Sequence, residues 1–180
     1  MHFGKPDTNN LSDDIGEAVM RSVIRNIRIL LKNHENYEAR SELMWASSMA
    51  ENDILKIGKI TDFQVHQLGA YTDCNHGEGL AVLHPVVYRH ICKDGADRFA
   101  RFARNVWGIE DKETVEQTAL AGVCALSEFI KEIGMPTTFS QMGISEDTDF
   151  RGIADSTNIT VGCCRKLTND EIFEILKECI

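Results

Sequence analysis

The sequence lacks the features that would place it outside the ordinary globular class. It has three prolines among 180 residues, 7% aromatic residues and no long apolar run. A proline-rich linker and a transmembrane helix are therefore not expected. With 43% apolar residues, a chain of this length buries about 70% of its unfolded surface on folding. We predict one folded domain over residues 1–180.

Basic charge is also scarce. The chain has 19 Lys and Arg against 28 Asp and Glu, a net charge of −9. Nucleic acid is not expected as a partner, because binding a phosphate backbone requires concentrated basic residues. The one basic stretch, residues 89–104, is interleaved with Asp94, Asp97 and apolar residues, which is typical of a solvated helix face.

The six cysteines form no Cys-x-x-Cys pair and no regular framework. No apolar stretch typical of a secretion signal follows the first methionine. We therefore expect a cytoplasmic protein with free thiols, several of them buried, and neither a disulfide framework nor a zinc finger.

Apolar residues recur with helical spacing along nearly the whole chain. Ile15, Val19, Val23 and Ile27 lie four residues apart and predict a buried stripe on a helix with Ser12 as its N-cap. Trp45 and Trp107 are predicted core residues. The nucleotide-binding patterns GxGxxG and GxxxxGK[ST] are absent. The spacing predicts an all-α bundle of about seven to nine helices. Those with clear limits cover residues 10–33, 37–57, 94–107, 112–133, 147–156 and a last segment capped by Thr168.

Residues that could perform chemistry concentrate between positions 62 and 81. His66 and His76 are separated by ten positions, so one helical turn cannot bring them together. They could bind one metal ion if His66 ends one helix and His76 begins the next, with Asp62 or Asp73 nearby. Two structural histidines remain the alternative from spacing alone.

Five segments carry a resemblance to a known family. Residues 66–71 are HQLGAY and residues 75–82 are NHGEGLAV, followed by a proline. Residues 36–46 are NYEARSELMWA, residues 98–108 are RFARFARNVWG, and residues 166–172 are KLTNDEI. Together they resemble the iron-containing (group III) alcohol dehydrogenases, in the branch of the butanol dehydrogenases.

The resemblance implies a fold and a chemistry. Such enzymes have an α/β dinucleotide-binding domain followed by an all-helical, dehydroquinate synthase-like domain. One Asp and three His hold a divalent ion (iron, zinc or manganese), which polarises the substrate oxygen while hydride passes to or from NAD(P). The dinucleotide-binding domain is not found in these residues, and neither is the Asp-x-x-x-His pair that supplies two ligands at the start of the family's helical domain. NAD(P) is therefore not expected to bind this chain alone.

The two remaining ligands map onto the segment that contains both histidines. His76 matches the last histidine ligand, but only His66 stands where the family has two histidines, a ligand and a second active-site residue. His66 corresponds to one or the other, and an ungapped alignment places Asp62 at the ligand position. The candidate metal ligands are His66, His76 and Asp62, and the candidate catalytic residue is His66.

The resemblance implies the metal-site domain of an NAD(P)-dependent alcohol or aldehyde dehydrogenase. We expect this domain to be inactive alone and to bind metal weakly, because two family ligands are missing. The alternatives are a non-catalytic helical interaction module and one half of a split, two-chain dehydrogenase. The expected partners are a separate dinucleotide-binding chain or further copies of this chain.

Overall fold

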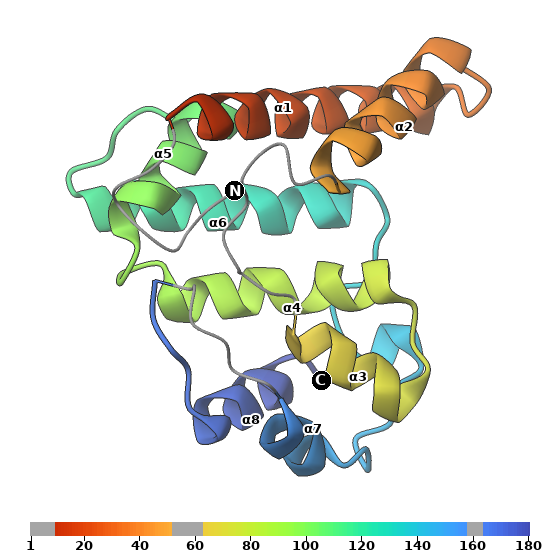
Figure 1. Cartoon of the computed structure of the whole chain (residues 1–180), viewed down its shortest axis with the longest axis vertical. Helices are drawn as coiled ribbons and strands as arrows, with labels where there is room; N and C mark the ends of the chain where they lie inside the picture. Colours follow the sequence, from red (N-terminus) through yellow and green to blue (C-terminus); the bar gives the residue numbers. More distant parts are fainter. Residues whose placement is uncertain (1–9, 52–62, 158–163) are drawn as a thin grey trace.

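The computed structural model describes residues 10–51, 63–157 and 164–180, and the predicted all-α fold is confirmed. These residues form eight α-helices and one short 3-10 helix, with no strand (Figure 1). None of these helices is long and apolar enough to cross a bilayer. The helices are α1 (Asn10–Lys32), α2 (Tyr37–Glu51), α3 (Phe63–Thr72), α4 (His76–Ile91), α5 (Ala96–Trp107), α6 (Val115–Glu132), η2 (Ser140–Met142), α7 (Phe150–Ser156) and α8 (Asn169–Glu178).

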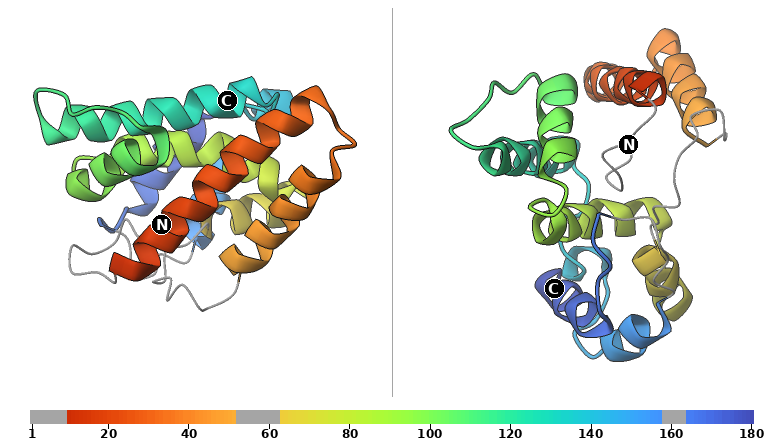
Figure 2. Two further views of the ribbon diagram at one scale, coloured as in Figure 1. Left: turned by 90° about the horizontal axis from the view of Figure 1, so that it is seen from above. Right: turned by 60° about the vertical axis from the view of Figure 1, so that its left-hand side comes forward.

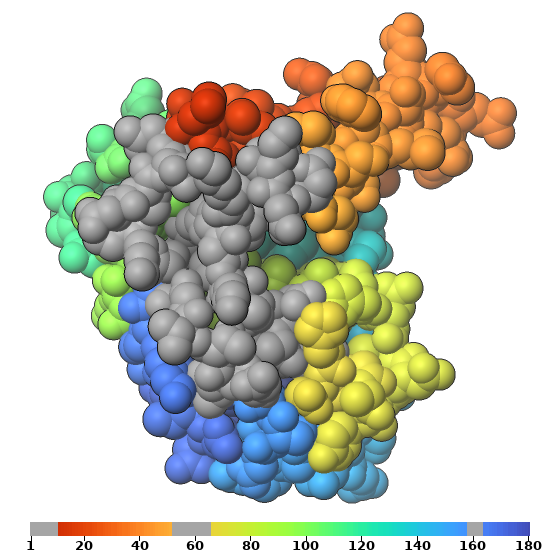
Figure 3. All heavy atoms as spheres, in the orientation of Figure 1, coloured from red at the N-terminus to blue at the C-terminus, as the bar shows by residue number. Residues whose placement is uncertain are grey.

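The helices lie in three tiers around α4. In Figure 1, α1 and α2 form the upper tier, α4, α5 and α6 the middle, and α3, α7 and α8 the lower one. Helix α4 contacts α6 on one side and α3 and α8 on the other. Two further views show that α1 crosses α6 diagonally (Figure 2). The space-filling view shows α2 projecting from the rest of the molecule (Figure 3).

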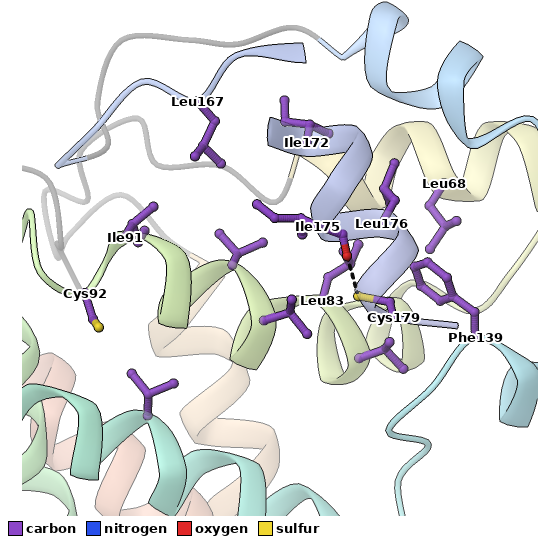
Figure 4. Close-up of a cluster of buried hydrophobic side chains, with 14 of the residues drawn as sticks. Leu68, Leu83, Ile91, Cys92, Phe139, Leu167, Ile172, Ile175, Leu176 and Cys179 are labelled. Carbon is purple, nitrogen blue, oxygen red and sulfur yellow. Dashed lines mark hydrogen bonds between the residues drawn. The ribbon is translucent and has the colours of Figure 1, made fainter. Parts of the chain in front are cut away.

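The hydrophobic core is built around α4 and α8. Leu83 of α4, Leu176 of α8 and the ring of Phe139 belong to one buried cluster, in which Leu176 lies near Leu68 of α3 (Figure 4). Burial of Cys179 in the same cluster raises the pKa of its thiol to about 12. The largest side chains with almost no exposure are Leu68, Val82, Leu83, Ile91, Phe99, Val123, Phe139, Ile153, Ile172, Ile175 and Leu176.

Several helix ends follow directly from the sequence. The Thr168 hydroxyl accepts a hydrogen bond from the amide of Glu171, whose carboxylate accepts one from the Thr168 amide, which confirms the predicted cap of α8. Thr114 caps α6 with Gln117 in the same way. Gly108 ends α5 in the left-handed conformation, with φ of 69°, which costs glycine little.

Helices α5 and α6 cross at their smallest residues. A Cβ atom at Gly122 would lie 2.8 Å from the Cβ atom of Ala103 and 3.0 Å from its Cα atom. The two backbones therefore approach more closely than any larger residue at either position would permit. This contact holds α6 close against α5.

Helix α1 departs from the sequence prediction in two ways. It begins at Asn10, so Ser12 lies inside the helix and is not its N-cap. Its predicted apolar stripe, including Val19 and Val23, is only half-buried. The buried residues of α1 are polar instead: Asp13, Glu17 and Asn26.

Buried ion pairs explain this reversal. The two guanidinium nitrogens of Arg98 donate to the two oxygens of Asp13 at 2.6 and 2.7 Å, and both side chains are almost fully buried. Next to this pair, Arg101 donates to Glu17 and, at 2.6 Å, to Asp14. Helix α1 is therefore attached to α5 through charged side chains.

Helix α2 also differs from the prediction. Its small residues Ala39 and Ala46 are buried, whereas Tyr37, Met44 and Trp45 are 81%, 73% and 67% exposed. Trp45 is therefore not a core residue, in contrast to Trp107, which packs against the rings of Phe102 and Phe129. The predicted continuation of this helix to residue 57 lies outside the described residues.

Asp13→Ala should lower the free energy of unfolding by about 3 kcal/mol, because it leaves the Arg98 guanidinium buried without its carboxylate. The matched control is Asp14→Ala, which removes an exposed carboxylate from Arg101 and should cost less than about 1 kcal/mol. Urea unfolding followed by circular dichroism measures both. Equal losses in the two variants would contradict a special role for the buried pair.

Candidate metal site

The candidate site lies at the junction of α3 and α4, which are joined by three residues, 73–75. The Asn75 side chain accepts a hydrogen bond from the amide of Glu78 at 3.2 Å and caps α4. This cap makes His76 the first residue of the helix. Asp73 turns the chain with a φ of 54°, and it is the one described non-glycine residue with positive φ.

The junction brings the two predicted histidines together. The ring centroids of His66 and His76 lie 4.9 Å apart, with 28° between the ring planes, and both residues are exposed. Imidazoles bound tetrahedrally to one ion have centroids about 5 Å apart, given metal–nitrogen distances of about 2 Å. The centroid spacing therefore matches that of two ligands of one ion, and the nearly parallel ring planes are also those of a stacked aromatic pair.

The prediction was wrong about the helix on which His66 lies. His66 is in the first turn of α3, which continues to Thr72, and does not end a helix. His76 begins α4 as predicted. Of the predicted carboxylates, Asp62 lies outside the described residues. Asp73 does not join the pair, because the described residues contain no group of three His, Cys, Asp or Glu side chains placed to hold a metal ion.

Helix α3 is positioned by α7. Leu68 is completely buried, and the Ser156 hydroxyl donates to the side-chain oxygen of Gln67 at 3.2 Å. The Tyr71 hydroxyl lies above Gly152, where a Cβ atom would come within 3.0 Å of it. These contacts fix the orientation of the turn that carries His66. They join positions far apart in the sequence, so helical spacing alone could not predict them.

A polar cavity of about 430 Å³ lies on the flank of the same junction. Thr72, Asp73, Cys74 and Asn75 border it from the junction, and Ser145 and Thr148 are among the residues that face them. Neither histidine of the pair lines it.

Comparison with known proteins identifies the family. The profile described as "Fe-containing alcohol dehydrogenase family, C-terminal" matches residues 2–180. The chain belongs to the iron-containing alcohol dehydrogenase family. It is 33% identical to NADH-dependent butanol dehydrogenase B of Clostridium acetobutylicum over all of this chain and 48% of that protein. It is 31% identical to NADH-dependent butanol dehydrogenase A of the same organism over 98% of this chain and 48% of that protein.

Solved structures agree with this assignment. The crystal structure of NADH-dependent butanol dehydrogenase A from Thermotoga maritima matches 99% of this chain and 48% of that chain, with a TM-score of 0.87 and 25% identity. The chain thus spans about half the length of the family members that it matches. The resemblance found in the sequence and the fold it implied are both confirmed.

The described residues fit the two cofactors of the family unequally. Two adjacent imidazoles suit a divalent ion. A dinucleotide is bound in known folds at the ends of parallel strands, and no strand occurs in the part of the chain that the structure describes.

Asp73→Val should lower the free energy of unfolding by about 1–2 kcal/mol, because a β-branched residue at positive φ is strained. Asp73→Gly is the matched control and should cost no stability, since glycine adopts this conformation freely. Thermal unfolding followed by circular dichroism measures both. An unaltered stability of Asp73→Val would contradict the tight turn that places His76 beside His66.

Proposed function

We propose that this chain supplies the metal-binding helical half of an NAD(P)-dependent alcohol or aldehyde oxidoreductase. The observation that carries the proposal is the adjacent pair of imidazoles, His66 and His76, at the α3–α4 junction. The named activity of its relatives, NADH-dependent butanol dehydrogenases, supports the reaction class.

Each proposed residue has a defined task. When bound, the ion would act as a Lewis acid on the substrate oxygen. His76 and His66 would hold it through their ring nitrogens, with Asp62, four positions before His66, as a third ligand. The second role open to His66 is that of an active-site histidine beside the substrate. In both cases α7 orients it through Gln67 and Tyr71.

We propose that a second polypeptide segment completes the catalytic unit. Hydride transfer requires a bound nicotinamide, and two imidazoles bind an ion less tightly than four protein ligands. The remaining ligands and the dinucleotide site would come from a dinucleotide-binding chain. The domain described here would be inactive without it.

An interaction module is the second candidate function, and α2 supports it. Tyr37, Met44 and Trp45 leave large apolar side chains in water on one projecting helix. Contiguous apolar exposure of this kind is typical of protein–protein contact surfaces. The dinucleotide-binding chain or another copy of this chain would be the partner at this surface.

Titration with Zn²⁺ should give a dissociation constant in the micromolar range, about 1–100 μM, because protein ligands occupy only part of the coordination sphere. His76→Ala should abolish this binding, since it removes one of the two adjacent imidazoles. Isothermal titration calorimetry measures the affinity.

The matched control for this titration is His90→Ala. His90 contacts Glu178 at 2.8 Å on another part of the molecule, so its removal should leave Zn²⁺ affinity unchanged. Zinc binding that persists in His76→Ala would contradict the proposed site and assign this histidine a structural role.

The isolated chain, loaded with Zn²⁺ or Fe²⁺, should not oxidise NADPH in the presence of butanal. The physical reason is that no described element provides a dinucleotide site. Nicotinamide absorbance measures turnover, and butanol dehydrogenase B of Clostridium acetobutylicum assayed with NADH serves as the positive control. Turnover that disappears in His76→Ala would show that this chain needs no second half.

A further inference from the structure

Helix α1 lies over a space that its own side chains do not fill. Its apolar residues Val19, Met20, Val23 and Ile24 point toward the body of the molecule, yet all four remain only half-buried. Apolar side chains at a helix interface are normally buried. The partial burial of four consecutive members of one stripe indicates a gap beneath α1.

Ion pairs near both ends of α1 hold it away from the body. Toward its N-terminal end, Asp13 pairs with the buried Arg98 of α5 at 2.6 Å. Toward its C-terminal end, Arg28 donates two hydrogen bonds of 2.7 Å to Glu132 of α6. This contact lowers the pKa of the Glu132 carboxyl. A bidentate arginine–carboxylate pair has a fixed geometry, so it sets both the position of α1 and its distance from the helix that it contacts.

Between these two ion pairs, the gap beneath α1 is an apolar cavity of about 360 Å³. Its floor includes Phe102 and Trp107 of α5 and Leu126 and Phe129 of α6. None of the described residues that line it is Asp, Glu, Lys or Arg. A charged ligand would lose its hydration there without compensation.

The α4 side of the cavity carries two polar rings. His84 and Tyr88 lie one helical turn apart with stacked rings, 5.1 Å between centroids, and both border the cavity. An imidazole and a phenol are both polar at the ring edge. This side of the cavity would therefore tolerate a polar atom of a ligand.

We propose that this cavity is a binding pocket for an uncharged, mostly apolar molecule of about the size of a two- or three-ring aromatic compound, with one polar group directed at α4. The volume of about 360 Å³ falls within the usual range of ligand pockets. It is more than twice the roughly 150 Å³ that holds benzene in an engineered protein cavity.

This pocket is distinct from the candidate metal site. Neither His66 nor His76 lines it, and His84 lies eight positions beyond His76, which corresponds to about 12 Å along α4. A ligand there would contact α1, α4, α5 and α6 together. It would thereby stabilise the attachment of α1 to the body without touching the metal.

The test uses N-phenyl-1-naphthylamine, a neutral fluorescent probe with one N–H group. In a Trp45→Phe background, Trp107 is the single tryptophan and lines the pocket. Excitation of Trp107 should then produce probe emission that saturates with a micromolar dissociation constant. The full chain is used, and His76→Ala should leave this binding unchanged.

Val23→Phe fills the pocket from α1 and should weaken probe binding at least tenfold. Leu126→Phe fills it from α6, and an equal loss there shows that the effect does not depend on α1 alone. The matched control is Val115→Phe, the same chemical change at a half-exposed position of α6 outside the pocket. Circular dichroism and thermal midpoints confirm that each variant is folded.

Absence of saturable binding to the folded Trp45→Phe chain would overturn the proposal. Binding that both filling variants retain would overturn it too, because the probe would then lie elsewhere, for example on the exposed face of α2. Loss of binding in the filling variants with retention in Val115→Phe is the supporting result.

Discussion

Helix α4 has neighbours on both sides, because α6 packs against one face and α3 and α8 pack against the other. Such a helix must be apolar nearly all round, and Val82, Leu83, Val86 and Val87 satisfy this requirement. Even Pro85 is buried inside it, although proline removes one backbone hydrogen bond from a helix. The burial of α4 therefore determines where its first residue, His76, is held.

The sequence predicted best those elements whose apolar face meets the core. In α5, Phe99, Phe102, Ala103 and Val106 recur with helical spacing and are buried, and in α8 so are Ile172, Ile175 and Leu176. Local signals were sufficient at these helices because one stripe and one cap define each of them. Helical spacing shows which residues form the apolar face of a helix, and in α5 and α8 the tertiary contacts bury that face.

The upper tier could not be predicted in this way. In α1 the decisive contacts join Asp13 and Glu17 to arginines more than eighty positions away, and periodicity carries no information about such partners. In α2, small side chains face α1, and the large ones, including Trp45, face water. A hydrophobic pattern assigns the larger apolar residues to the core, which is the opposite arrangement.

The candidate site was predictable only in part, because it too depends on contacts between helices. The family resemblance assigned His66 and His76 to one site, whereas their spacing alone left two structural histidines as the alternative, and the rings do lie together. Which side chain could serve as a third ligand depends on how the helices pack against one another. The exclusion of Asp73 from the pair follows from the tight turn, which no spacing rule describes.

The charged attachment of α1 makes the upper tier sensitive to ionic strength. The Arg28–Glu132 pair is exposed on both sides, so dissolved salt screens it over a distance of about 8 Å at physiological concentration. The Arg98–Asp13 pair is enclosed by protein and is screened far less. As salt increases, the end of α1 near Arg28 would therefore loosen first, and the helix would pivot about Asp13.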